Sequence, residues 1–525
     1  MSGADNETLA EALEEAARRW PERPALIDRH RRLTHAELAD AVARLAAGYA
    51  RLGLAGGARV VSCVSNRCEA LIALGAAWRY GAVHVGAEDR STGPELAAIV
   101  EQTGADLLLY EPVPGSADPL APMQTVRRVH PDLHVVIVGD VPVHEEWTRW
   151  SELVDSGAEP FAKARPGMRD PAIVFVSSGT TGRPKATVGF HGNLARRWRR
   201  LGGWLEFSPD DVHLAQLPLS HGFGMMMAVA ALLSGGRLVL HERFSAEAAL
   251  AAVGDEGITV VNGAPAHFKL LLNRLDQARH DVGTLRLSVG TAAPFAPELV
   301  TDIWERLGVR FMFMYGSSEG VGVATTDEDD IMRGSVGRPA PGSTAIVGPD
   351  HRPLPVGTVG EVAFSRGVYP VRYWEDHDAL RPPEPEPVAN GDWYYSGDLG
   401  RLDEEGRLYI VGRLKHQIDR GGLKVDPMEV ENALLTRPEV ADAAVLGLLN
   451  PVLGEEVCAC VAPSPGEAPT LAGLRDALGE RLAPHKLPEV LYLLDEIPRT
   501  RIGKVDSDRL RDLMDARRPQ RLVRR

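Results

Sequence analysis

The sequence has few cysteines, no long apolar run and no excess of positive charge, and each shortage argues against one class of protein. Four cysteines in 525 residues are too few for a disulfide framework, so we expect a reducing, cytoplasmic compartment. The longest uncharged apolar run, residues 222–233, is shorter than the roughly 20 residues of a membrane-spanning helix, and the acidic N-terminus is unlike a signal peptide. A net charge of −14 argues against a nucleic-acid surface.

What is present is the composition of an ordinary globular protein, with 44% hydrophobic and 25% charged residues. Up to about residue 341, helix and strand patterns alternate, with a capping box at Thr34 and Glu37 before a helix to about Leu52. Such alternation predicts an α/β fold, in which a large N-terminal domain of parallel or mixed sheets is covered by helices. Short strands and turns from Gly342 predict a β-rich subdomain, and the segment after Arg413 predicts a small α+β domain.

The stretch SSGTTGRPK, residues 177–185, has the composition of an anion-binding loop. It lies between two strand-like runs, 171–176 and 186–190, so we expect a loop between strands. Its spacing differs from that of the phosphate loop that precedes a helix. Glycines let the backbone approach a phosphate closely, hydroxyls donate to its oxygens, and Lys185 supplies a cation. The alternative is a plain turn with solvated Ser and Thr side chains.

A second pattern, G-x-S-x-G at residues 316–320, raises the alternative of a serine hydrolase with Ser318 as nucleophile. The stretch 221–224, HGFG, is similar to an oxyanion loop. A nucleophile elbow needs a helix after the serine, however, and residues 321–326, VGVATT, are poor helix material. The hydrolase therefore stays a remote alternative.

Five segments, in order, resemble the adenylate-forming superfamily of acyl-CoA synthetases, non-ribosomal adenylation domains and luciferases. They are SSGTTGRPK (177–185), YGSSEG (315–320), YSGDLGRLDEEGRLYIVGR (395–413), GGLKVDPMEVEN (421–432) and PRTRIGK (498–504). Their order and spacing cover nearly the whole chain. The resemblance implies an N-terminal domain of residues 1–412, a hinge at 413–416 and a mobile C-terminal domain of residues 417–525.

The activity that the resemblance implies has two steps. A carboxylate attacks the α-phosphate of ATP to give an acyl-adenylate and pyrophosphate, and a thiol then takes the acyl group. A carboxylate with a pKa near 4 is already ionised and needs no general base. The protein's task is to neutralise the charges and align the reactants. The expected co-reactants are ATP, Mg²⁺ and coenzyme A or a carrier-protein pantetheine.

The resemblance also assigns roles to individual residues. Lys504 and Ser318 would contact the α-phosphate, and Glu319 would bind Mg²⁺. The β- and γ-phosphates would lie on Ser177, Ser178, Gly179, Thr180, Thr181, Gly182 and Lys185. Adenine and ribose would lie among Thr291, Ala292, Ala293, Tyr315, Gly316, Ser317, Tyr395, Asp398 and Arg413, with Asp398 on the ribose hydroxyls.

For the second step the resemblance implies rotation about Lys415, which removes Lys504 and brings Gly421 and Gly422 over the site. Asp419 stands where many relatives carry lysine. The acid would enter beside His221 into an apolar pocket that suits a planar aryl acid or a medium acyl chain. Its walls would be Phe223, Gly224, Met225, Gly290, Val321 and Gly322.

Three alternatives stay open at this point. The protein could be a stand-alone adenylating enzyme that serves a carrier protein, a relative that activates nitrite for diazotisation of an aryl amine, or a ligand-binding relative without activity. A homodimer is also compatible with the sequence. An α-amino acid substrate is disfavoured, because no buried charge is set aside for an amino group.

Overall fold

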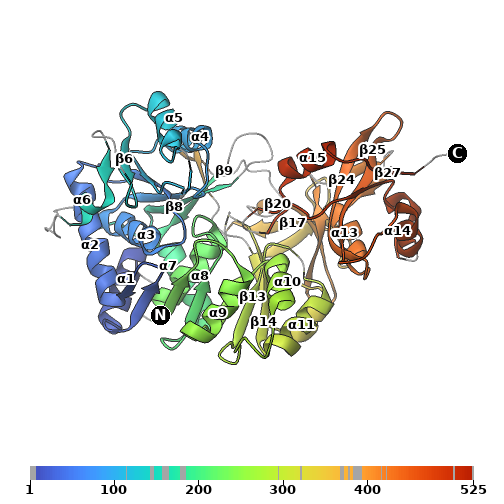
Figure 1. Cartoon of the computed structure of the whole chain (residues 1–525), viewed down its shortest axis with the longest axis horizontal. Helices are drawn as coiled ribbons and strands as arrows, with labels where there is room; N and C mark the ends of the chain where they lie inside the picture. Colours follow the sequence, from blue (N-terminus) through green and yellow to red (C-terminus); the bar gives the residue numbers. More distant parts are fainter. Residues whose placement is uncertain are drawn as a thin grey trace.

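Four β-sheets and the helices around them make up the fold in the computed structural model of the chain (Figure 1). The structure describes all residues except 1–6, 114, 117, 142–146, 156–164, 178–184, 294, 318, 320–321, 367–371, 376–378, 382–392, 415–416, 421–422, 480, 501–502 and 523–525. At Ser177 and Lys185 it describes the backbone alone. The predicted α/β fold class is confirmed.

The first large sheet has nine strands in the order β19-β18-β9-β8-β4-β3-β5-β6-β7, and strands β8, β4, β3, β5, β6 and β7 run parallel. Side chains of neighbouring residues on β3 enter different cores, because alternate residues of a strand face opposite sides. The strands are β3 (Arg59–Cys63), β4 (Val83–Gly86), β5 (Leu107–Tyr110), β6 (His134–Ile137), β7 (Thr148–Arg149), β8 (Pro171–Ser177), β9 (Lys185–Phe190), β18 (Tyr373–Glu375) and β19 (Ala379–Arg381).

The second large sheet has eight strands in the order β15-β14-β13-β12-β10-β11-β1-β2, and its central strands β14 to β1 are parallel. Parallel strands present their carboxyl ends at one edge, where ligands of α/β proteins bind. The strands are β1 (Pro24–Ile27), β2 (Arg32–Thr34), β10 (Val212–Ala215), β11 (Arg237–Leu240), β12 (Val260–Gly263), β13 (Leu287–Gly290), β14 (Arg310–Gly316) and β15 (Gly322–Thr325).

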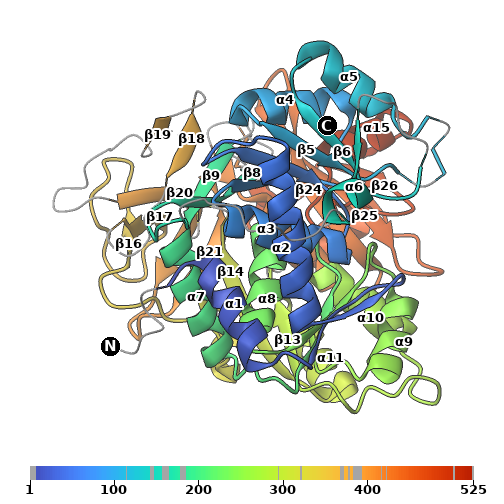
Figure 2. The ribbon, with the colours of Figure 1, turned by 90° about the vertical axis from the view of Figure 1, so that its left-hand side faces the viewer.

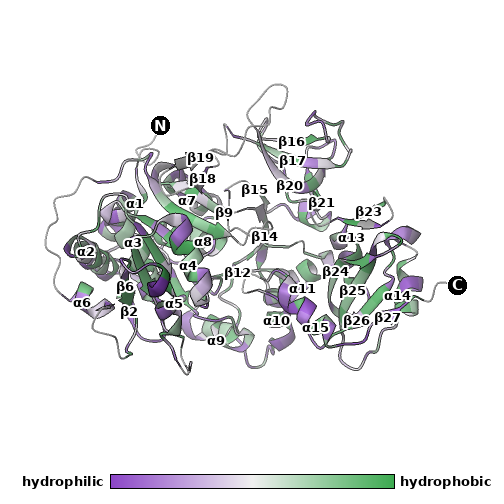
Figure 3. Cartoon of the chain, turned by 90° about the horizontal axis from the view of Figure 1, so that it is seen from above, coloured by the Kyte–Doolittle hydropathy of each residue, from purple (hydrophilic) through white to green (hydrophobic). Residues whose placement is uncertain are grey.

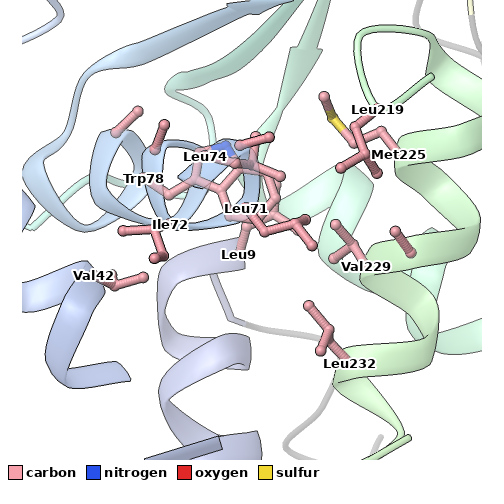
Figure 4. Close-up of a cluster of buried hydrophobic side chains, with 14 of the residues drawn as sticks. Leu9, Val42, Leu71, Ile72, Leu74, Trp78, Leu219, Met225, Val229 and Leu232 are labelled. Carbon is pink, nitrogen blue, oxygen red and sulfur yellow. The ribbon is translucent and has the colours of Figure 1, made fainter. Parts of the chain in front are cut away.

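Helices form the layers between and outside these two sheets (Figures 1 and 2). One core joins both sheets through α1 (Leu9–Arg19), α2 (His35–Arg51), α3 (Cys68–Tyr80), α7 (His191–Trp204) and α8 (Gly222–Leu233). Figure 4 shows Trp78 and Leu71 of α3 beside Leu9 of α1 and Val229 of α8. The short helix α6 (Trp150–Val154) also adds to this core. The outer layers are α4 (Gly93–Thr103) and α5 (Ala121–Val129) on one sheet, and α9 (Ala246–Glu256), α10 (Pro265–Arg274), α11 (Pro297–Leu307) and α12 (Glu328–Met332) on the other.

Two smaller sheets follow along the chain. The first is antiparallel, with the order β16-β17-β20-β21, and corresponds to the predicted β-rich subdomain. The second begins after Arg413 and has its own two cores (Figure 3). The elements are β16 (Thr344–Val347), β17 (Gly360–Ser365), β20 (Trp393–Leu402), β21 (Leu408–Arg413), β22 (Ile418–Arg420), β23 (Leu423–Val425), β24 (Val440–Asn450), β25 (Gly454–Pro463), β26 (Val490–Leu493), β27 (Gln520–Arg521), α13 (Pro427–Leu435), α14 (Leu471–Leu478), the short 3₁₀-helix at Pro484–Lys486 and α15 (Ser507–Asp515).

Most predicted element boundaries agree with the structure to within two residues. The capping box before α2 is present, because Thr34 Oγ1 accepts from Glu37 N at 3.2 Å and Thr34 N donates to Glu37 Oε2 at 2.8 Å. The helix expected at 470–482 is shorter, since α14 ends at Leu478. Among the described helices none is long and apolar enough to cross a membrane.

The carboxyl of Glu431 on α13 should make stability depend on pH. Burial, with help from Asp426 and Asp442, raises its pKa from 4.5 to about 7, while Val445 N donates to Oε1 at 2.8 Å. A pKa raised in the folded state stabilises the fold below pH 4.5, and this contribution is lost as pH rises through 7. A shift of this size corresponds to about 3 kcal/mol.

We therefore expect Glu431→Gln, which keeps the oxygen acceptor without the charge, to flatten the fall in stability between pH 5 and pH 8. Urea unfolding of both proteins at the two pH values measures this difference. Equal losses in the variant and the parent would show that Glu431 is not the group responsible.

Candidate active site

Asp398 is the buried centre of a polar cluster where β20, β21 and β14 meet. It is 4% exposed and lies opposite Arg413 in the β20–β21 register. Arg413 Nε donates to Asp398 Oδ1 at 2.5 Å, and Tyr315 Oη donates to Oδ2 at 2.6 Å. Burial and the negative charge of Asp398 raise the pKa of the Tyr315 phenol, so its hydroxyl stays a donor. The structure thus brings together three predicted residues from two motifs, Tyr315 from residues 315–320 and Asp398 and Arg413 from residues 395–413.

Glu319 lies nearby, on the segment that follows β14. Tyr373 Oη donates to Glu319 Oε1 at 3.3 Å. Burial, followed by the charge of Glu319, raises the pKa of the phenols of both Tyr373 and Tyr394. Among the described residues no group of three or more His, Cys, Asp or Glu side chains surrounds a common point.

Lys504 comes from the C-terminal sheet region and reaches the same cluster. The surrounding protein lowers the pKa of its ammonium, first by desolvation and then through the positive charge of Arg413, whereas Asp398 and Glu319 act in the opposite sense. The side chain nevertheless keeps more than a third of its surface accessible. Lys504 therefore comes to the cluster from the connection between β26 and α15.

The loop that carries Lys504 rests directly on the large domain. Gly503 has φ +82°, and a Cβ on it would lie 2.6 Å from Cβ of Ala264, which immediately precedes α10. Glycine adopts this conformation without strain, and its missing side chain allows so close an approach. On the small-domain side, Arg499 Nη1 donates to Gly503 O at 2.9 Å and Nη2 to Asp442 Oδ1 at 2.6 Å. The Gly503 loop thus contacts both the residue before α10 and, through Arg499, Asp442 of β24.

His221 precedes α8 on a loop that two residues outside the predicted set hold in place. Asn66 Nδ2 donates to Ala215 O at 3.1 Å and Leu217 O at 2.8 Å, and its Oδ1 accepts from Leu219 N at 3.0 Å. His221 Nε2 lies 3.1 Å from Glu88 Oε1, an oxygen on the segment after β4. Neither Asn66 nor Glu88 belongs to a recognisable motif, so the sequence alone offered no signal for them.

The described residues among those predicted to line the acid pocket are either glycines or apolar side chains of α8. Gly224 and Gly290 leave room for neighbours, because a Cβ would lie 2.4 Å from Pro218 O and 2.5 Å from Phe311 Cζ respectively. Gly322 pairs with Gly316 at the start of β15. Phe223 is half-buried against the core between the sheets, whereas Met225 is 1% exposed and belongs to that core (Figure 4).

The segment predicted to lie beside adenine, Thr291, Ala292 and Ala293, follows β13. Thr291 N donates to Gly263 O at 3.1 Å. Tyr395 stacks on His351 with ring centroids 4.3 Å apart and an interplanar angle of 26°. The buried Ser317 Oγ has no hydrogen-bond partner within the part of the chain that the structure describes.

Ala292 has φ +73°, a left-handed conformation that costs an alanine about 1 kcal/mol or more. Ala292→Gly should remove this strain at a smaller cost in unfolded-state entropy, so we expect a gain of about 0.5 to 1 kcal/mol in stability. Ala293→Gly, where φ is not positive, should lower stability instead. Urea unfolding of the two variants measures the signs, and a loss in both would contradict the strain at Ala292.

Several predicted residues lie outside the described set: Ser178, Gly179, Thr180, Thr181, Gly182, Ser318, Val321, Lys415, Gly421 and Gly422. Ser177 ends β8 and Lys185 begins β9, and these strands pair antiparallel. The glycine-rich segment therefore connects two strands, as expected. Strand β15 follows the G-x-S-x-G pattern, pairing antiparallel with β14, and it occupies the place where a hydrolase would need a helix.

Comparison with known proteins finds matches that cover nearly the whole chain. The sequence matches the family model of the AMP-binding enzyme over residues 13–370 and that of the AMP-binding enzyme C-terminal domain over residues 429–504. An indoleacetate–CoA ligase of Aromatoleum aromaticum is 32% identical, over 96% of this chain and 98% of its own.

Two further relatives extend the comparison. A salicyl-AMP ligase / salicyl-S-ArCP synthetase of Mycobacterium tuberculosis is 31% identical, over 95% of this chain and 89% of its own. Among solved structures, ATP-bound MatB from Rhodopseudomonas palustris superposes with a TM-score of 0.82 at 27% identity, covering 96% of this chain and 98% of that one.

Proposed function

The chain belongs to the AMP-binding enzyme family of adenylate-forming ligases, and we propose that it activates an aromatic carboxylic acid and transfers the acyl group to coenzyme A. In the first step a carboxylate oxygen attacks the α-phosphorus of ATP, and the bond to pyrophosphate breaks. In the second step the sulfur of the thiol attacks the acyl carbon, AMP leaves, and the thiol proton is released.

One observation carries this proposal: the loop of Gly503 and Lys504 in the small domain packs against Ala264 of the large one, and Asp398, Arg413 and Glu319 act on Lys504 electrostatically. A serine hydrolase does not need a lysine from a second domain at its active site. Attack of one anion on a polyanion does need a mobile cation at the point of reaction, because the charge there must be neutralised as the bond forms.

The buried cluster supports a nucleotide site. Arg413 and Tyr315 each occupy one oxygen of Asp398, and a carboxylate offers about four acceptor positions. Two positions remain for the ribose hydroxyls, and the two donors hold the carboxylate in a fixed orientation. The glycine-rich connection between β8 and β9 would bind the β- and γ-phosphates.

Glu319 suits a magnesium ion shared with ATP phosphates. Mg²⁺ takes one or two carboxylates together with phosphate oxygens, and Glu319 is a half-buried carboxylate. Bound there, the ion would neutralise phosphate charge. Tyr373 orients the carboxylate through its 3.3 Å hydrogen bond.

For the second step we propose domains 1–412 and 417–525 with a hinge at 413–416. Rotation about Lys415 would remove Lys504 and bring Gly421 and Gly422 over the adenylate, where the absence of side chains leaves room for a pantetheine arm. A second acceptor, a carrier-protein thiol, is favoured by the similarity to the salicyl-AMP ligase / salicyl-S-ArCP synthetase of Mycobacterium tuberculosis.

The test is ATP–pyrophosphate exchange with a panel of aromatic, medium-chain and dicarboxylic acids. We expect exchange with at least one aromatic acid, and formation of its thioester when coenzyme A is added. If the acyl group passes only to a carrier protein, the acceptor in this proposal is wrong and the first step still holds. Nitrite with aryl amines belongs in the same panel, and exchange with no acid at all would overturn the proposal.

A further inference from the structure

A small polar cavity lies under the first turns of α8, on the face of the sheet that α8 covers. Its volume is about 10 Å³, the space that one water-sized group needs. Two polar side chains, Asn262 and His213, face it among apolar neighbours. The lining residues are His213, Leu214, Ala215, Leu217, Gly224, Met227, Ala228, Leu238 and Asn262.

Asn262 is directed to this side by the alternation of β12. Val260 belongs to the core between the two sheets and Val261 to the core on the other face, so Asn262 shares the face of Val260. It is 4% exposed, and its Oδ1 has no hydrogen-bond partner in the described part of the chain. A buried amide oxygen without a partner costs about 1 to 3 kcal/mol, which a ligand donor would recover.

His213, on β10, adds a second group without a partner. It is 2% exposed, and neither ring nitrogen has a hydrogen-bond partner among the described residues. Burial lowers its pKa to about 4, so the ring is neutral at pH 7. The cavity therefore offers neutral donors and acceptors, and none of its lining side chains carries a charge at that pH.

The cavity and the proposed acid site share two elements, strand β12 and helix α8. Ala264, two residues after Asn262, is the residue on which Gly503 rests, directly before Lys504. Gly224 in the first turn of α8 lines the cavity and lies three residues after His221. Asn262 thus lies two residues along the chain from the contact that positions the Lys504 loop, on the strand β12 side of it.

We propose that Asn262 and His213 form the polar floor of the acid pocket and select an aromatic acid with one hydroxyl or neutral amino group at its far end. This inference rests on the proposed function. The space admits a single non-hydrogen atom, which excludes a second carboxylate there. A carboxylate or an ammonium would also be buried without a countercharge, which is strongly unfavourable.

The experiment compares acids in matched pairs by pyrophosphate exchange: benzoate with its three hydroxy and three amino isomers, and cinnamate with its hydroxy isomers. For the parent enzyme, we expect one isomer to exceed its unsubstituted partner in kcat/KM by about 10-fold or more, because the unsubstituted acid leaves the polar floor unpaired. Asn262→Leu, similar in size but apolar, should reduce that ratio to about 1, chiefly through loss of activity with the substituted acid.

Ser288→Ala is the matched control. Ser288 is a fully buried residue on the neighbouring strand β13, and its Oγ also has no described partner, but it pairs in register with Val261 and Phe311 of the opposite core. The control should keep the parental ratio.

No exchange with any acid would overturn the proposed function itself. Exchange in which the parent shows no preference for a substituted acid would overturn the polar floor alone, whether or not Asn262→Leu folds. The polar floor would also be overturned if Asn262→Leu lowered kcat/KM for both acids of a pair by the same factor.

Discussion

Asp398→Ala should raise the KM for ATP by about 10²-fold and change turnover at saturating ATP much less. The ribose hydroxyls are bound in both the ground state and the transition state, so their loss is a loss of uniform binding. Each hydrogen bond to a charged group contributes about 1.5 to 3 kcal/mol, and two such bonds at the lower end of this range give about 10²-fold. The variant also leaves Arg413 and the buried Tyr315 hydroxyl without their shared partner, so a fall in stability is expected as well.

Tyr315→Phe separates the two effects. It removes the 2.6 Å hydrogen bond to Asp398 but leaves the carboxylate and its ion pair with Arg413. We expect a rise in the KM for ATP of about 10-fold or less, since one neutral donor is lost. Steady-state kinetics at varied ATP measure both variants. A large fall in turnover for Asp398→Ala with the KM for ATP unchanged would contradict a ribose contact.

Local sequence patterns predicted elements that depend on neighbours in the chain. The capping box at Thr34 and Glu37 and the alternation from β3 to β5 both have such local causes, and both agree with the structure. Side-chain contacts between residues that are far apart in the sequence have no such local pattern. Asp398 and Arg413 are fifteen residues apart in sequence, but Tyr315 is eighty-three residues from Asp398, and only the resemblance placed all three in one site.

Two buried asparagines, Asn66 and Asn262, show most clearly which contacts the sequence does not predict. Asn66 holds the loop before His221 through three hydrogen bonds to a segment about 150 residues away, and a single asparagine in a turn carries no sign of that task. Asn262 stands in an apolar strand, VVNG, where the side chain's surroundings depend on α8. Long-range contacts of single polar residues follow from the assembled fold and leave no periodic trace.

Lys504→Ala should fold, bind ATP and lose adenylation by at least 10²- to 10³-fold. That is the usual effect of removing a preorganised donor at the point where charge develops. It is also within the roughly 4 kcal/mol of one charge contact at about 4 Å with an effective dielectric near 20. Because the pKa of Lys504 is lowered, the cation is lost as pH rises toward this pKa. The alkaline fall of parental adenylation should therefore begin below the usual lysine range near 10.4, and the variant should lack it.

The second half-reaction distinguishes a mobile Lys504 from a fixed one. Supplied with pre-made acyl-adenylate, Lys504→Ala should form thioester at close to the parental rate, because rotation has by then removed Lys504 from the site. Lys486→Ala is the control in the same domain, since Lys486 pairs with Glu429 at 2.7 Å and should leave both half-reactions unchanged. The orientation seen here, with Gly503 resting on Ala264, serves adenylation alone on this account. Equal loss in both assays would mean that Lys504 stays at the site throughout, and domain rotation would have to be given up for this enzyme.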